Sequence, residues 1–307
     1  MAIMNPLLKS VFTAAAVALV VLACSIALIA PQLRVSVVGP PALDQKRHYA
    51  FNGVQRLQIE NNDGALRVRP HERDTVEVTA RITMYTYLTE DEPMAREYMD
   101  SLLVSETGNN ALTLTSEPEA RPGELEVFVD YTIHVPLGTD LDIDNANGNV
   151  WVGRGSGDVR VQGRNADIEV FAPQGAVAAR TTNGRIRVLD APEGADLETV
   201  NGNVYAHIMG GRLRAESTNG SVVARVLDAG VEACDLISRN GGITVILSEP
   251  SAEVHAETGR GSVRSDAPLA PGAITHRRQM RGTIGGGGTR LNLDTLNGNI
   301  WITGSTS

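Results

Sequence analysis

The stretch "TVNGNVYA", residues 199 to 206, decides the fold, because close copies of it recur along the chain. We take the glycine of each Asn-Gly as position zero and name each repeat unit by its residue there. Gly148, Ala166, Gly184, Gly202 and Gly220 lie 18 residues apart, and Gly241, Gly261 and Gly298 follow at 21, 20 and 37. A fixed period of this kind is the signature of a repeat protein.

Hydrophobic residues alternate on both sides of position zero. Val204 and Ala206 follow Gly202, and Leu213 and Ala215 precede Gly220. A period of two predicts short β-strands with one buried face. A small polar residue occupies the inward position three before zero in most units: Asn145, Thr181, Thr199, Ser217, Ser238, Thr258 and Thr295.

Two architectures fit this pattern, a meander of antiparallel hairpins and a solenoid of parallel coils. The signs of the outward charges distinguish between them. Residues 18 apart are neighbours in a solenoid, and most charged pairs there have opposite signs: Asp142 with Arg160, Asp167 with Arg185, Glu169 with Arg187, Arg180 with Glu198, and Asp196 with Arg214. A hairpin would instead place Arg180 opposite Arg187, and like charges destabilise a sheet. We therefore expect an all-β fold, a parallel β-solenoid with 18-residue coils.

Asparagine precedes position zero in most units, which predicts a ladder of side-chain amides along one corner of the solenoid. We expect this ladder to satisfy turn groups that would otherwise be buried without partners. Its members are Asn147, Asn165, Asn183, Asn201, Asn219, Asn240 and Asn297.

Two segments interrupt the repeat. Residues 90–104 have helical spacing and an acidic start, which predicts a short inserted helix. Residues 268–290 break the register, and we expect them to form a loop or a degenerate coil.

Residues 11–30, "VFTAAAVALVVLACSIALIA", contain no charge and match the length of a bilayer-spanning helix. A single-pass anchor, a cleaved signal peptide and a lipoprotein lipidated on Cys24 all fit this segment. By analogy with other anchored envelope proteins, we expect a single-pass membrane protein whose large C-terminal domain is extracytoplasmic. The chain then divides into an anchor or signal segment (1–34), a linker (35–49), an early repeat region with the inserted helix (50–136), the regular units (137–304) and a tail (305–307).

Composition and motifs argue against several classes of function. The net charge of −9 does not provide the basic surface that nucleic-acid binding requires. The histidines lack metal-ligand spacing, and the glycine-rich stretches lack the context of a phosphate loop. We therefore expect no metal, no cofactor and no catalytic residues. His134, His207 and His255 fall on outward strand positions, where we expect solvent, whereas Cys234 falls on an inward one.

Three outward aromatic residues share one position in the repeat. Trp151, Tyr205 and Trp301 each lie three residues after position zero, so a solenoid places them in one row. Exposed rings in a row can stack on sugars or contact a partner protein. They are the candidate binding surface.

The order of these motifs resembles the bacterial putative-adhesin family of β-strand-repeat proteins. The resemblance rests on "LQIENNDGALRV", on "YTIHVP" leading into "LDIDNANGNVWV", on the serial "TNG" units and on "GGGGTRLNLDTLNGNIWI". It covers residues 50 to 304. It implies surface attachment and an N-terminal membrane segment or signal, and it implies no catalytic residues.

We therefore expect a non-enzymatic, membrane-anchored β-solenoid of the cell envelope that presents a repetitive surface for adhesion or for binding an envelope protein or a glycan. One alternative is a self-associating envelope scaffold, since the sequence shows no polar cap after Trp301. The other is a polysaccharide-acting enzyme with Asp142 and Asp144 as its acids, because parallel β-helices host such enzymes.

Overall fold

The alternation of inward and outward residues along the units builds two large, mostly parallel β-sheets. The computed structural model describes residues 41–86, 92–116, 125–227 and 230–304, and within these ranges the sheets have 12 and 13 strands. In the repeat region each strand pairs in parallel with its equivalent in the next unit, so that Val204 lies opposite Val222 and Leu197 opposite Ala215. The hairpin meander is therefore excluded.

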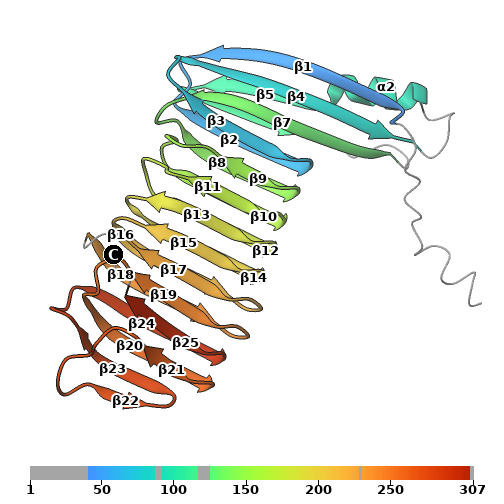
Figure 1. The fold of residues 1–307 in the computed structure, drawn as a ribbon. Helices are drawn as coiled ribbons and strands as arrows, with labels where there is room; N and C mark the ends of the chain where they lie inside the picture. Colours follow the sequence, from blue (N-terminus) through green and yellow to red (C-terminus); the bar gives the residue numbers. More distant parts are fainter. Residues whose placement is uncertain (1–40, 87–91, 117–124, 228–229, 305–307) are drawn as a thin grey trace, which may run out of the picture. The chain divides into compact units, whose positions relative to one another are not determined.

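Figure 1 shows the strands of the repeat region lying one beside the next. In spatial order, the 12-stranded sheet contains β1 (Leu43–Asn52), β4 (Thr75–Tyr85), β7 (Glu126–Pro136), β3 (Leu66–His71), β9 (Val150–Val152), β11 (Ile168–Phe171), β13 (Ile186–Ala191), β15 (Val204–Ile208), β17 (Val222–Val226), β19 (Ile243–Leu247), β25 (Ile300–Gly304) and β21 (Val263–Ser265). The 13-stranded sheet contains β22 (Ile274–His276), β23 (Gln279–Ile284), β20 (Ala252–Arg260), β24 (Thr289–Asn297), β18 (Val231–Ser238), β16 (Gly211–Ser217), β14 (Gly194–Asn201), β12 (Val177–Asn183), β10 (Val159–Asn165), β8 (Asp140–Asn147), β2 (Arg56–Asp63), β6 (Ala111–Ser116) and β5 (Leu103–Gly108).

Position zero is glycine because consecutive units come closest there. A Cβ atom added at Gly202 would overlap the carbonyl oxygen of Gly184, and one added at Gly220 would overlap the carbonyl oxygen of Gly202. At this corner, therefore, backbone stacks directly on backbone. The close contacts and the strand register order the units in space as Gly64, Gly148, Ala166, Gly184, Gly202, Gly220, Gly241, Gly298 and Gly261.

The inward residues of both sheets form one hydrophobic core. Val204, Ala206, Leu213 and Ala215 are all buried, as their period of two predicts. Burying one large aliphatic side chain contributes about 1.5 to 3 kcal/mol. Since each unit buries its inward face only between its neighbours, stacking is the main source of stability.

The small polar residues three before position zero face this core, and all of them except Thr181 bond to the stacked turns. Ser217 donates from Oγ to the carbonyl oxygen of Gly202 at 2.8 Å. Equivalent bonds to position-zero carbonyls come from Thr199, Ser238, Thr258 and Thr295. The carbonyl oxygens at position zero are thus reached by inward hydroxyl groups, whereas Asn147 of the ladder bonds to the carbonyl oxygen of Asn62.

The units do not stack in chain order throughout. β24 pairs in parallel with β18 on one side and with β20 on the other. β25 likewise lies between β19 and β21. Residues 289–304 are therefore inserted between two units that precede them in the sequence.

Antiparallel strands close both ends of the 13-stranded sheet. β22 and β23 form a hairpin along β20, and β5 pairs with β6. Residues 268–290, predicted as a loop or a degenerate coil, contain this hairpin between loop segments, and its Met280 and Ile284 pack into the core. Trp301 belongs to the inserted unit, and the hairpin borders the 13-stranded sheet beyond β20, whereas β21 is the edge of the 12-stranded sheet. In the 12-stranded sheet, β1, β4 and β7 run antiparallel.

The inserted helix is α2 (Glu92–Ser101), within the predicted range of 90–104. Ala95, Tyr98 and Met99 form its buried side. Among the described residues, no helix has the length and hydropathy of a membrane span. The predicted segment 1–34, with Cys24, lies outside these residues, as does the tail 305–307.

Candidate functional site

The outer face of the 12-stranded sheet carries the predicted aromatic row. The strand register places Trp151, Tyr205 and Trp301 in one line. Trp151 and Tyr205 are half-buried, whereas Trp301 is 51% exposed and donates from Nε1 to Asp266 at 3.0 Å. The strand neighbours of Trp301 in the row carry no ring, so it stands apart from the other two aromatic residues.

Trp151 and Tyr205 belong to a continuous series of contacts across β9, β11, β13 and β15. The ring centroids of Trp151 and Phe171 are 5.7 Å apart. The guanidinium carbon of Arg187 lies 5.7 Å from the centroid of Phe171 and 5.9 Å from that of Tyr205, within the range of cation–π contacts. The ring of His207 follows at 5.1 Å from that of Tyr205. We name these five residues the aromatic strip.

His207 is held by neighbouring side chains, so the expectation that it is solvated is wrong. Its side chain is 18% exposed, with Nδ1 3.8 Å from a carboxylate oxygen of Asp190 and Nε2 2.7 Å from the hydroxyl of Tyr205. The 2.7 Å contact is a hydrogen bond between the ring and the hydroxyl, whereas the carboxylate at 3.8 Å lies beyond hydrogen-bond distance. Burial lowers the pKa of His207 below its ordinary value of 6.5.

A β-bulge brings Asp190 to this histidine. The register between β13 and β15 shifts between Val188 and Ala191, and Asp190 has a positive φ of 57°. Aspartate is one of the non-glycine residue types that adopt the left-handed region most readily, which suits this bulge. Bulges also redirect side chains. The Gly184 unit therefore departs from the regular repeat next to the aromatic strip.

Two half-buried arginines flank β15, and within the described ranges neither forms an ion pair. Arg187 on β13 lies beside Tyr205, and Arg225 on β17 lies beside His207. Nε of Arg225 is buried without a hydrogen-bond partner. Three other arginines in the repeat form the pairs that the sequence predicts: Arg180 with Glu198 at 3.4 Å, Arg185 with Asp167 at 3.0 Å and Arg214 with Asp196 at 3.7 Å.

The predicted asparagines lie in a row beside the stacked glycines. Each side chain donates to the amide oxygen of the asparagine in the preceding unit in space, and Asn147 donates to Asp63. Six hydrogen bonds between side-chain amides, 2.6 to 2.9 Å long, form this row: Asn165 to Asn147, Asn183 to Asn165, Asn201 to Asn183, Asn219 to Asn201, Asn240 to Asn219 and Asn297 to Asn240. With donors and acceptors used along the row, this is a structural feature of the corner.

The outer face of the 13-stranded sheet has an open groove of about 730 Å³. The residues that line it carry both signs of charge, including Asp142, Arg160 and Arg214. Ala178, with its small side chain, also lines it. Asp144 lies two residues beyond Asp142 on the same exposed face of β8. The two acids of the enzymatic alternative are therefore solvent-facing neighbours on one strand.

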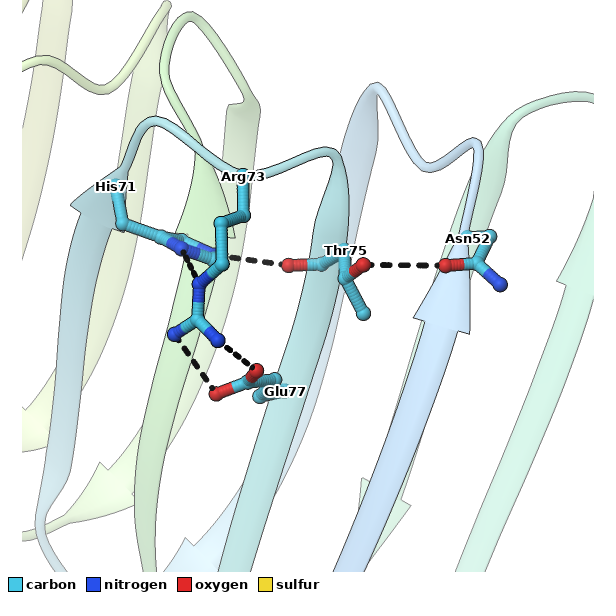
Figure 2. Close-up of polar contacts among 5 residues, drawn as sticks. All are labelled: Asn52, His71, Arg73, Thr75 and Glu77. Atoms are coloured by element: carbon cyan, nitrogen blue, oxygen red, sulfur yellow. Dashed lines mark hydrogen bonds and ion pairs between the residues drawn. The ribbon is translucent and has the colours of Figure 1, made fainter.

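A second polar cluster lies at the turn between β3 and β4 (Figure 2). Arg73 donates from Nε to Nδ1 of His71 at 3.1 Å and contacts the carboxylate of Glu77 at 2.7 Å. Nε2 of His71 is 2.8 Å from the carbonyl oxygen of Thr75, and Thr75 bonds to Asn52. Both ring nitrogens of His71 are thus engaged within the turn, which leaves neither free for a ligand.

Comparisons with known proteins add a likeness to several solved structures. No family model matches the sequence, and no curated protein matches it. A Bacteroides fragilis protein named a "putative adhesin" is 12% identical with a TM-score of 0.44, covering 87% of this chain and 99% of that one. A Parabacteroides distasonis "putative lipid binding protein" is 10% identical with a TM-score of 0.41, covering 86% and 97%. A Clostridium sporogenes "putative cell adhesion protein" is 12% identical with a TM-score of 0.25, covering 86% and 100%.

Sequence reasoning found Trp151 and Tyr205. It expected Arg187 to pair with Glu169 and His207 to face solvent, and it missed Phe171. Phe171, five residues after Ala166, breaks the spacing that defined the row. Asp190 and His207 come together only through the bulge, and no local sequence motif predicts this bulge. One signal was available: "VLDAPEG" carries an extra residue between the inward Val188 and Ala191.

Proposed function

We propose that this chain is a non-enzymatic β-solenoid of the cell envelope that binds glycans on its aromatic strip. The observation that carries the proposal is the run of half-buried rings on adjacent strands, Trp151 to Phe171 and Tyr205 to His207, with Arg187 between them. Rings fixed by their neighbours present apolar faces to a sugar with little loss of side-chain entropy. Strand spacing of about 4.8 Å spreads them over a length that suits an extended saccharide.

The test is a glycan array probed with the purified full-length chain in detergent micelles, followed by titration calorimetry on the best ligand. Trp151→Ala and Tyr205→Ala should each weaken binding about tenfold or more, since an aromatic contact contributes about 1.5 kcal/mol. Trp301→Ala is the matched control, because its ring lies outside the strip, and it should bind as the unaltered chain does. An array with no bound glycan would overturn the proposal.

The proposal includes membrane attachment through residues 11–30 and a C-terminal domain outside the cytoplasm. An envelope location gives a glycan-binding surface access to polysaccharide. Protease added to spheroplasts of a strain expressing the chain with a cytoplasmic control protein should degrade the domain and spare the control. Protection of the domain until the spheroplasts are lysed would contradict this placement.

A further inference from the structure

Two arginines in and beside the aromatic strip form no ion pair with any described carboxylate. Arg187 and Arg225 are both half-buried, and neither is in an ion pair within the part of the chain that the structure describes. Burying a charge without a partner is costly. Other arginines of the repeat do form ion pairs with carboxylates, such as Arg185 with Asp167.

The geometry leaves both guanidinium groups available to one ligand. Arg187 on β13 and Arg225 on β17 stand on either side of β15, so two strand spacings, about 10 Å, separate their backbones. The guanidinium of Arg187 lies over the rings of Phe171 and Tyr205, and it forms no hydrogen bond to another described side chain. Nε of Arg225 is buried without a hydrogen-bond partner, so a ligand would contact the terminal nitrogens of this group.

The nearby acids do not fill these positions. Asp190 faces His207 at 3.8 Å. Glu169 is the register neighbour of Arg187, yet the two form no ion pair, because the guanidinium lies over the rings instead. A planar guanidinium with open N–H groups matches the two oxygens of a carboxylate.

We infer that this site binds acidic polysaccharides through sugar carboxylates, one held by Arg187 and a second, farther along the same chain, by Arg225, while a sugar ring stacks on Trp151. This inference rests on the proposed glycan binding and adds its substrate class: uronic-acid polymers. The bulge at Asp190 holds His207 and Tyr205 between the two arginines, which fixes the floor of the site.

The experiment titrates the full-length chain in detergent micelles with three polymers of matched length: oligogalacturonate, neutral dextran and dextran sulfate. Oligogalacturonate should bind at least about tenfold more tightly than dextran, and its affinity should fall as salt rises. Arg187→Gln and Arg225→Gln should each weaken oligogalacturonate binding about tenfold, since each removes one charge-assisted pair. Arg214→Gln, on the opposite sheet and already paired with Asp196, is the control and should bind normally.

The outcomes separate this inference from the proposed function. Equal affinity for dextran and oligogalacturonate, unchanged in both arginine variants, would overturn the carboxylate site and leave glycan binding standing. Tighter binding of dextran sulfate than of oligogalacturonate would assign the site to sulfate and overturn the uronate assignment. Failure of the chain to bind any glycan, here and on the array, would remove both. Unchanged circular dichroism of each variant establishes that a lost affinity reflects the site.

Discussion

The side-chain amide of Asn201 donates a hydrogen bond at 2.8 Å to the amide oxygen of Asn183, its equivalent in the preceding unit. Asn219 in turn donates to Asn201. Asn201→Ala removes both bonds, and since a hydrogen bond contributes about 0.5 to 1.5 kcal/mol, we expect the free energy of unfolding to fall by about 1 to 2 kcal/mol. Urea denaturation measures this loss. Gln162→Ala, an exposed position on β10, should change stability by less than about 0.5 kcal/mol, and an equal loss there would contradict a role for the ladder.

Gly202 has no room for a side chain, because a Cβ atom there would overlap the carbonyl oxygen of Gly184. Gly202→Ala must separate two stacked units, and we expect it to destabilise the fold by about 3 kcal/mol, the upper range for overpacking. Gly108→Ala is the control, since no atom lies within 4 Å of a Cβ added there. Equal melting temperatures for the two variants would show that the corner can relax.

Gly163 and Ala166 compensate for each other at the one position zero in the regular units that is not glycine. A Cβ atom at residue 163 would lie 2.8 Å from the Cβ of Ala166. Gly163→Thr alone should therefore destabilise the chain by about 1 to 3 kcal/mol. The double variant Gly163→Thr, Ala166→Gly restores the residue types of the other units and should recover most of that loss. A double-mutant cycle of unfolding free energies tests this coupling, and additive effects would disprove it.

Cys234 is buried and free, and burial raises the pKa of its thiol to about 12. At pH 8 almost none of it is thiolate, the reactive form. In a Cys24→Ser background, a disulfide reagent should leave the native chain unlabelled for hours and label one thiol per chain at once in denaturant. Rapid labelling under native conditions would show that the core opens locally.

His207 makes stability depend on pH. Its pKa is lower in the folded chain than the ordinary 6.5, so the unfolded chain binds more protons between these two values. The free energy of unfolding therefore falls as pH drops through about 6.5, and the loss is complete below the folded pKa. His207→Gln should show a smaller fall between pH 7.5 and 5 in urea titrations. Identical pH profiles for the variant and the unaltered chain would contradict this assignment.

Much of the fold can be predicted from the sequence because the same hydrophobic and charge pattern recurs in each unit. The inward positions of Val204 and Leu213 follow from the period of two, and the parallel pairing follows from charges 18 residues apart. The spatial order of the last units does not follow from local pattern. Arg260 stands where other units have asparagine, and the structure puts that unit at the end of the ladder, where no further asparagine needs an acceptor.

The candidate site was less predictable for a related reason. Trp151 and Tyr205 repeat a position and could be found, whereas Asp190 and His207 meet at a local departure from the repeat. A bulge is a single extra residue whose effect depends on the strands around it. Residues that come together at an irregularity of the repeat cannot be found from the periodicity of the sequence.

The insertion of residues 289–304 between the Gly241 and Gly261 units constrains the order of events during synthesis. The ribosome delivers this unit after both of its spatial neighbours, so growth of the stack from one end to the other cannot produce the final arrangement. β18 and β20 must stay apart, or separate again, until β24 arrives between them. Completion of the repeat therefore depends on long-range pairing, as does the pairing of β2 with β8 and of β3 with β9 at the other end of the units.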